Sequence, residues 1–120
     1  MNSILEKVKD LKNIAILKNQ LISTAESCTG GLISKYLTDI AGSSSFFESS
    51  VVTYSNDSKI SLLNVNPKTL SIHGAVSEEV VKEMSLGLLK ISTATIAISI
   101  SGIMGPDSDN TSKKIGSTWL

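Results

Sequence analysis

Three consecutive residues, Ser27, Cys28 and Thr29, carry side chains that can act as nucleophiles. A serine hydroxyl attacks at neutral pH only with a neighbouring base, and the oxyanion that forms needs hydrogen-bond donors. Gly30 and Gly31 follow, and glycines allow a ligand to approach the backbone closely. On these residues alone two interpretations stand. The segment is either a hydrolase nucleophile on a strand-to-helix turn, or a helix start in which Ser27 or Thr29 is the N-cap and Cys28 belongs to the core.

A serine nucleophile needs a base from elsewhere in the chain. His73 is the only histidine, and a lone histidine in an expected connection is more often structural than part of a Ser-His-Asp triad. Lys59 is the other candidate, because burial that lowers the pKa of a lysine makes it a base. On pattern alone, an exposed Lys59 is the alternative. One histidine and one cysteine do not make a zinc site, and neither GxGxxG nor P-loop spacing is present, so no metal or cofactor is predicted.

Helical and extended patterns alternate along the chain. Apolar spacing and cap residues predict helices over residues 4–15, from Leu32, over Asn56–Leu63 and from Ser77. Alternating or β-branched runs predict strands over Leu21–Ala25, Phe46–Tyr54, Ala94–Ser101 and Ile115–Leu120. This alternation predicts an α/β domain in which helices cover a largely parallel sheet. Ligands bind beyond the carboxyl ends of the strands in such sheets, where the turns 26–31 and 102–106 are expected.

Composition narrows the class of protein. The 120 residues are expected to form one domain, with zero formal net charge and no arginine. Neutral charge is not the footprint of a nucleic-acid binder. A single cysteine favours a reducing compartment, and neither a signal peptide nor a membrane span is expected, so a cytoplasmic protein is predicted.

Several motifs, read together and in order, resemble one known family. The segment Thr24–Gly31 resembles the signature of the CinA C-terminal family. The further matches are Ala41–Ser44, Val52–Asn56 with Lys59, His73–Ser77, Ser101–Ile103 with Gly105 and Pro106, and Gly116–Trp119. The resemblance extends from about Leu21 over nearly the whole chain.

The resemblance implies a three-layer α/β/α sandwich and a bacterial, metal-free serine/lysine amidohydrolase. It also implies conversion of nicotinamide mononucleotide to nicotinate mononucleotide and ammonia, in pyridine-nucleotide recycling. Carried over by motif, Ser27 is the expected nucleophile, Lys59 the base and Tyr54 a partner in the same hydrogen-bond network. The residues then expected to bind the substrate are Glu26, Thr29, Gly30, Gly31, Ser44, Gly102 and Gly105.

The chain also departs from the family pattern. It ends at Leu120, where the family continues with more sheet, a long helix and an arginine associated with the site, so a C-terminally truncated domain is expected. Met104, residues 107–109 and Lys114 also differ from the usual residues. A truncated sheet edge favours pairing, and a homo-oligomer is expected.

Three alternatives to an active amidohydrolase follow from these residues. The chain could be an inactive nucleotide-binding remnant of the family, or an interaction protein linked to the family's competence and DNA-damage label, although neutral charge argues against direct DNA contact. It could also be a hydrolase that uses Cys28 as its nucleophile.

Overall fold

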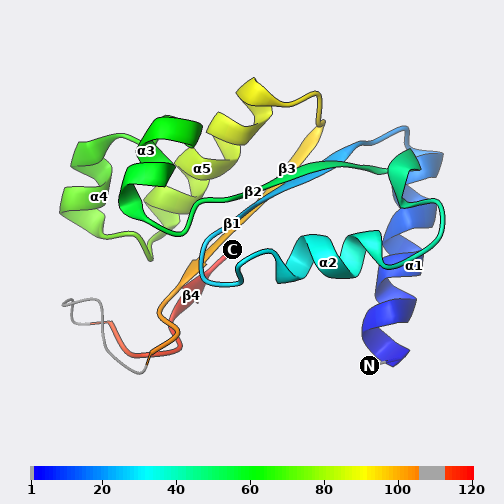
Figure 1. Cartoon of the computed structure of the whole chain (residues 1–120), viewed down its shortest axis with the longest axis horizontal. Helices are drawn as coiled ribbons and strands as arrows, with labels where there is room; N and C mark the ends of the chain where they lie inside the picture. Colours follow the sequence, from blue (N-terminus) through cyan, green and yellow to red (C-terminus); the bar gives the residue numbers. More distant parts are fainter. Residues whose placement is uncertain (1, 106–112) are drawn as a thin grey trace.

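The computed structural model describes residues 2–105 and 113–120 (Figure 1). Pro106 and the unusual residues 107–109 lie outside this part of the chain. The helices are α1 (Asn2–Leu17), α2 (Leu32–Thr38), η1 (Ser43–Ser45), α3 (Asn56–Leu63), α4 (Pro67–His73) and α5 (Glu78–Ile91). The strands are β1 (Ile22–Glu26), β2 (Phe47–Val52), β3 (Ile96–Gly102) and β4 (Thr118–Trp119).

The four strands form one sheet in the order β2-β1-β3-β4. The central strand β1 runs parallel to β2 and to β3, and β4 pairs antiparallel with the end of β3. Glu26, the last residue of β1, is opposite Val52 on one side and Ile100 on the other. The carboxyl ends of the three parallel strands therefore meet at one edge of the sheet, which is where parallel sheets place their ligands.

Helices cover both faces of this sheet, and each face has its own core. On one face α1 and α2 pack over β1, with Ile22, Leu37 and Phe46 in the core. On the other face α3, α4 and α5 pack over the sheet, with Leu63, Met84 and Leu88 buried against Ala25. Figure 1 shows the two helical layers on opposite sides of the strands. The predicted three-layer α/β/α sandwich with a largely parallel sheet is confirmed.

Side-chain caps fix where the helices of the second layer begin. The Ser55 hydroxyl accepts a hydrogen bond from Ser58 N at the start of α3, and Ser77 caps α5 through Val80 N. Asn66 caps α4, whose first residue is Pro67. His73 was expected in a connection, and the structure places it instead at the end of the short helix α4, which forms because Leu70 packs into the core.

Helices α3 and α5 approach each other closely at one glycine. A Cβ atom built on Gly87 of α5 would lie 1.9 Å from the carbonyl oxygen of Leu63, at the end of α3. Only glycine allows this contact, so Gly87 sets the distance between the two helices. Within the described ranges, none of the helices combines the length and apolar composition needed to cross a membrane.

Candidate active site

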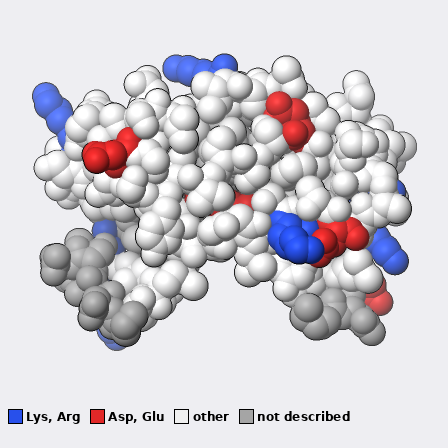
Figure 2. Space-filling model, in the orientation of Figure 1, with Lys and Arg blue, Asp and Glu red and all other residues white. Residues whose placement is uncertain are grey.

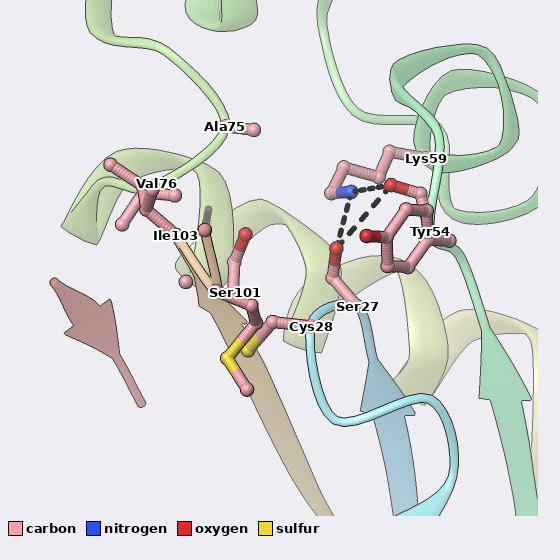
Figure 3. A pocket seen from close by; sticks show the side chains of 11 residues that line it. Ser27, Cys28, Tyr54, Lys59, Ala75, Val76, Ser101 and Ile103 are labelled. Atoms are coloured by element: carbon pink, nitrogen blue, oxygen red, sulfur yellow. Dashed lines mark hydrogen bonds between the residues drawn. The ribbon is translucent and has the colours of Figure 1, made fainter. Parts of the chain in front are cut away.

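A pocket lies at the carboxyl ends of the parallel strands. Ser27 and Cys28 enter it from the turn after β1, Tyr54 and Lys59 from the segment after β2, and Ser101 to Gly105 from the end of β3 and the turn that follows. Ala75 and Val76, just before α5, close one side. Figure 3 shows the Ser27 hydroxyl and the Lys59 side-chain nitrogen pointing toward each other in this pocket.

The Ser27 hydroxyl and the Lys59 amine are in direct contact. Lys59 Nζ lies 2.9 Å from Ser27 Oγ, and it donates to the main-chain oxygens of Thr53 at 2.7 Å and Tyr54 at 3.1 Å. Helix α3 carries Lys59 one turn after its Ser55 cap, which directs the side chain back toward the strand ends. The lysine is 1% exposed, so the interpretation of Lys59 as a solvated surface lysine does not hold.

Burial lowers the pKa of Lys59 to about 8, with only a small opposing effect from Cys28. A neutral amine has two N–H groups and one lone pair. In the structure Lys59 Nζ donates to Ser27 Oγ and to the carbonyls of Thr53 and Tyr54. When the amine loses a proton, the two carbonyls can keep its N–H groups, and the lone pair then faces the Ser27 hydroxyl. The arrangement can therefore transfer the Ser27 proton to Lys59.

The turn after β1 exposes backbone donors beside the nucleophile. Ser27 N donates to Ile100 O, and Gly30 N donates to Ser27 O, which fixes the turn to the sheet. Among the described residues, the N–H groups of Cys28 and Thr29 make no hydrogen bond to a main-chain oxygen, and both lie close to the Cys28 thiol. N–H groups in this position next to a nucleophile can stabilise an oxyanion.

The neighbouring thiol is less suited to attack. Burial raises the pKa of Cys28, and the nearby backbone N–H groups and the charge of Lys59 offset this only in part. The reactive form of cysteine is the thiolate, so a raised pKa disfavours Cys28 as the nucleophile.

Tyr54 enters the pocket in a different way from the expected one. Its main-chain oxygen accepts from Lys59 and lies 3.4 Å from Ser27 Oγ. Its ring is 69% exposed at the mouth of the pocket, and the phenol hydroxyl makes no hydrogen bond within the described part of the chain.

Two of the expected substrate-binding glycines lie in the pocket wall. A Cβ on Gly102 would lie 2.8 Å from Thr118 Oγ1 and 3.0 Å from Cys28 Sγ, so this position has no room for a side chain. Gly105 has a φ of +75°, and a Cβ there would be 2.8 Å from Ile115. Both residues let the second turn approach the first.

The other expected substrate-binding residues do not line the pocket. The Glu26 carboxylate is fully buried beneath the turn, where it accepts a hydrogen bond from Thr29 Oγ1. Gly30 and Gly31 have positive φ angles and lead the chain from the turn into α2. Ser44 lies in η1, next to the amino end of β2, at the opposite edge of the sheet from Ser27. The geometry therefore does not bring Ser44 to the nucleophile of the same chain.

One pocket residue was missed by the sequence analysis. Ser101 is 1% exposed, lines the pocket, and its hydroxyl makes no hydrogen bond with the described residues. Figure 3 shows Ser101 among the side chains that line the pocket. The signal lay in the alternation of β3. Ser99 faces α5 and contacts the Ser85 hydroxyl at 2.6 Å, so Ser101 shares that face two residues nearer the strand end.

The remaining candidates give no competing site. His73 is exposed on α4, 3.7 Å from Glu79, and is not among the residues that line the pocket. The described residues contain no cluster of three or more histidine, cysteine, aspartate or glutamate side chains that could hold a metal ion. On the face drawn in Figure 2 the lysines are scattered among neutral side chains, so that face shows no basic patch for nucleic acid.

The sequence is similar to known proteins over most of its length. The sequence model of the CinA C-terminal domain matches residues 5–120. The nicotinamide-nucleotide amidohydrolase PncC of Escherichia coli K12 is 54% identical over 99 residues, which are 82% of this chain and 60% of that protein. A putative competence-damage inducible protein of Symbiobacterium thermophilum is 50% identical over 99 residues, 82% of this chain and 23% of that protein. The chain thus spans less than two thirds of the length of these relatives.

Two solved structures have the same fold over most of this chain. The competence damage-inducible protein A (ComA) of Klebsiella pneumoniae superposes with a TM-score of 0.94 at 37% identity, over 97% of this chain and 72% of that one. The competence/damage inducible protein CihA of Agrobacterium tumefaciens superposes with a TM-score of 0.91 at 40% identity, over 96% and 70% of the two chains.

Proposed function

The chain belongs to the CinA C-terminal domain family, and on this premise we propose that it hydrolyses the carboxamide of nicotinamide mononucleotide. The products are ammonia and nicotinate mononucleotide, and the nucleotide returns to pyridine-nucleotide recycling. The contact between Ser27 Oγ and Lys59 Nζ carries this proposal, because it joins a nucleophile to a buried amine of lowered pKa. The name of the E. coli relative supports the substrate class.

The reaction begins with proton transfer inside the dyad. Neutral Lys59 takes the proton of Ser27 as Oγ attacks the amide carbon, and the carbonyl oxygen becomes an oxyanion. The N–H groups of Cys28 and Thr29 donate to that oxyanion. When the C–N bond breaks, protonated Lys59 returns its proton to the departing nitrogen, which leaves as ammonia. An acyl ester on Ser27 remains.

The second half of the reaction uses the same lysine. Lys59 is neutral again after ammonia leaves, and it takes a proton from a water molecule that attacks the ester carbon. The proton then passes to Ser27 Oγ as the C–O bond breaks, which frees the carboxylate product and restores the dyad. No metal or cofactor is needed for any of these steps.

The rest of the pocket can position a nucleotide. The exposed ring of Tyr54 offers a face for a pyridinium ring, and the unpartnered Ser101 hydroxyl offers a hydrogen bond to a polar group. The sequence contains no arginine, and the Ile103 N–H group already donates to Ser117 O, so the backbone N–H groups of Met104 and Gly105 are proposed to meet the phosphate.

The test of this function compares three substrates. Ammonia release is measured with nicotinamide mononucleotide, nicotinamide riboside and nicotinamide, and the acid product is identified by mass. We expect turnover of the mononucleotide in preference to the other two. Binding of the mononucleotide by the folded chain without release of ammonia would contradict the proposal and support a nucleotide-binding role instead.

A further inference from the structure

The Glu26 carboxylate is buried next to the nucleophile but makes no contact with the pocket. It is 0% exposed at the end of β1, directly before Ser27, and it is not among the residues that line the pocket. From the sequence, Glu26 was expected to bind substrate. A fully buried carboxylate beneath the turn needs a different explanation, because burying a charge is costly unless hydrogen bonds compensate.

Five hydrogen bonds converge on this carboxylate. Oε1 accepts from Thr29 Oγ1 at 2.7 Å and from Ile33 N at 2.9 Å. Oε2 accepts from Ser34 N at 2.9 Å, from Thr24 Oγ1 at 3.0 Å and from Ser50 Oγ at 3.5 Å. Three of the donors lie in the turn after Ser27 or at the start of α2, and the other two lie on the strands β1 and β2. The carboxylate therefore joins the turn to the sheet.

The pattern of donors shows what the carboxylate replaces. The N-cap position of α2 is Gly31, which has no side chain and adopts a φ of 105°. An N-cap side chain accepts from the second and third N–H groups of its helix, and these belong here to Ile33 and Ser34. Here Glu26, which lies at the end of the preceding strand, accepts hydrogen bonds from both of these N–H groups. The turn 27–31 is thus spanned by one side chain that holds its two ends.

The carboxylate is charged when the protein is folded. Burial alone raises the pKa of Glu26, but the hydrogen bonds from Thr29, Ser34, Ile33 and Thr24 outweigh it and leave the pKa below its ordinary value. Charge-assisted hydrogen bonds are stronger and shorter than neutral ones. They are suited to hold a turn whose two glycines would otherwise leave it free to move.

We propose that Glu26 is a positioning residue that sets the nucleophile turn through Thr29 and the start of α2, so that Ser27 Oγ meets Lys59 and the N–H groups of Cys28 and Thr29 stay beside the nucleophile. This inference rests on the proposed amidohydrolase function, which it deepens. It also assigns Thr29 to the turn instead of to the substrate, because the Thr29 hydroxyl is committed to Glu26.

The test uses two threonines that donate to the same carboxylate from opposite sides. Thr29→Val removes the donor on the turn, and Thr24→Val removes the donor on the strand. We expect T29V to lower kcat about tenfold with KM unchanged, comparable to one hydrogen bond to a charged group. T24V is expected to keep kcat within about twofold, because it leaves the turn tied down. A raised KM with an unchanged kcat in T29V would show that Thr29 binds substrate, and would overturn the proposal.

Glu26→Gln provides the stronger perturbation, and Glu48→Gln is its matched control. Glu48 also accepts hydrogen bonds from serine hydroxyls, those of Ser23 and Ser49, but it lies on β2 away from the turn. We expect E26Q to lower kcat by about 100-fold through misplacement of the nucleophile, and E48Q to match the parent. Equal losses of kcat in both variants would overturn the proposal.

A second readout does not depend on turnover. Amide hydrogen exchange at Gly30, Ile33 and Ser34, whose N–H groups donate hydrogen bonds at the two ends of the turn, is expected to speed up in T29V and E26Q, and not in T24V or E48Q. If the parent chain releases no ammonia, the proposed function fails, whereas the exchange comparison still decides whether Glu26 orders the turn. Unchanged exchange in folded T29V and E26Q would overturn that ordering.

Discussion

Lys59 Nζ lies 2.9 Å from Ser27 Oγ, although the two residues are 32 positions apart in the sequence. The parallel pairing of β1 and β2 brings them together, because both strands end at the same edge of the sheet. Ser27 follows β1 directly, and Lys59 lies in α3, the helix that follows β2. The main-chain oxygens of Thr53 and Tyr54 then orient the amine. The predictions below follow from this contact and from the packing that maintains it.

The activity is expected to rise with pH. Lys59 acts as a base only when it is neutral, and its pKa is about 8, so kcat/KM should increase from pH 6.5 and level off above about pH 9. The measurement is the initial rate of ammonia release at low substrate concentration across this range. A rate that rises instead with a midpoint near the ordinary value for histidine, about 6.5, would contradict Lys59 as the base.

The free energy of unfolding should also depend on pH because of the lowered pKa of Lys59. The pKa of Lys59 is about 8 in the folded protein and 10.5 in an ordinary environment, so the unfolded chain holds this proton over a pH range in which the folded chain has lost it. Stability relative to Lys59→Met is then expected to increase between about pH 8 and pH 10.5, by up to ~3 kcal/mol. Urea unfolding of both proteins at pH 7 and pH 10 tests this, and an unchanged difference between them would refute a lowered pKa.

Gly87 is expected to be required for the position of Lys59. A Cβ at this position would lie 1.9 Å from Leu63 O, so Gly87→Ala must push α5 away from α3, the helix that carries Lys59. We expect a loss of about 1–3 kcal/mol in unfolding free energy, and a lower kcat in the folded fraction. Lys82→Ala, on the exposed side of α5, is the control and should change neither quantity. Parental stability in G87A would show that the two helices tolerate separation.

Much of the fold and of the dyad was predictable from the sequence. Alternating helical and extended patterns indicated the sheet and its helical layers, since the periodicities of buried faces are local features. The base was harder, because Lys59 has polar neighbours in sequence such as Asp57 and Ser58, and only the fold buries it. The resemblance of its motif to a known family supplied what the pattern could not.

Glu26, Ser44 and Ser101 could not be assigned from the sequence, because the fold alone decides which groups their side chains contact. Glu26 next to a nucleophile is compatible with either substrate binding or capping, and sequence alone does not show that Ile33 and Ser34 turn their N–H groups toward it. The Ser44 motif follows the nucleophile motif in the sequence but not in space. After Ser27 the chain returns through α2 to the amino end of β2, where Ser44 lies. Ser101 is one of several small residues in β3, and the sequence does not show which of them faces a pocket.

The most direct test of the account is ammonia release from nicotinamide mononucleotide by the purified chain, by Ser27→Ala, by Lys59→Ala and by their double variant, with Cys28→Ala as control. The account predicts that each single variant of the dyad loses about 1000-fold or more in kcat, that the double variant is no worse, and that C28A stays active, because the two dyad residues act as one unit. Parental turnover by folded S27A or K59A, or a loss in C28A as large as that in S27A, would contradict the Ser27–Lys59 assignment.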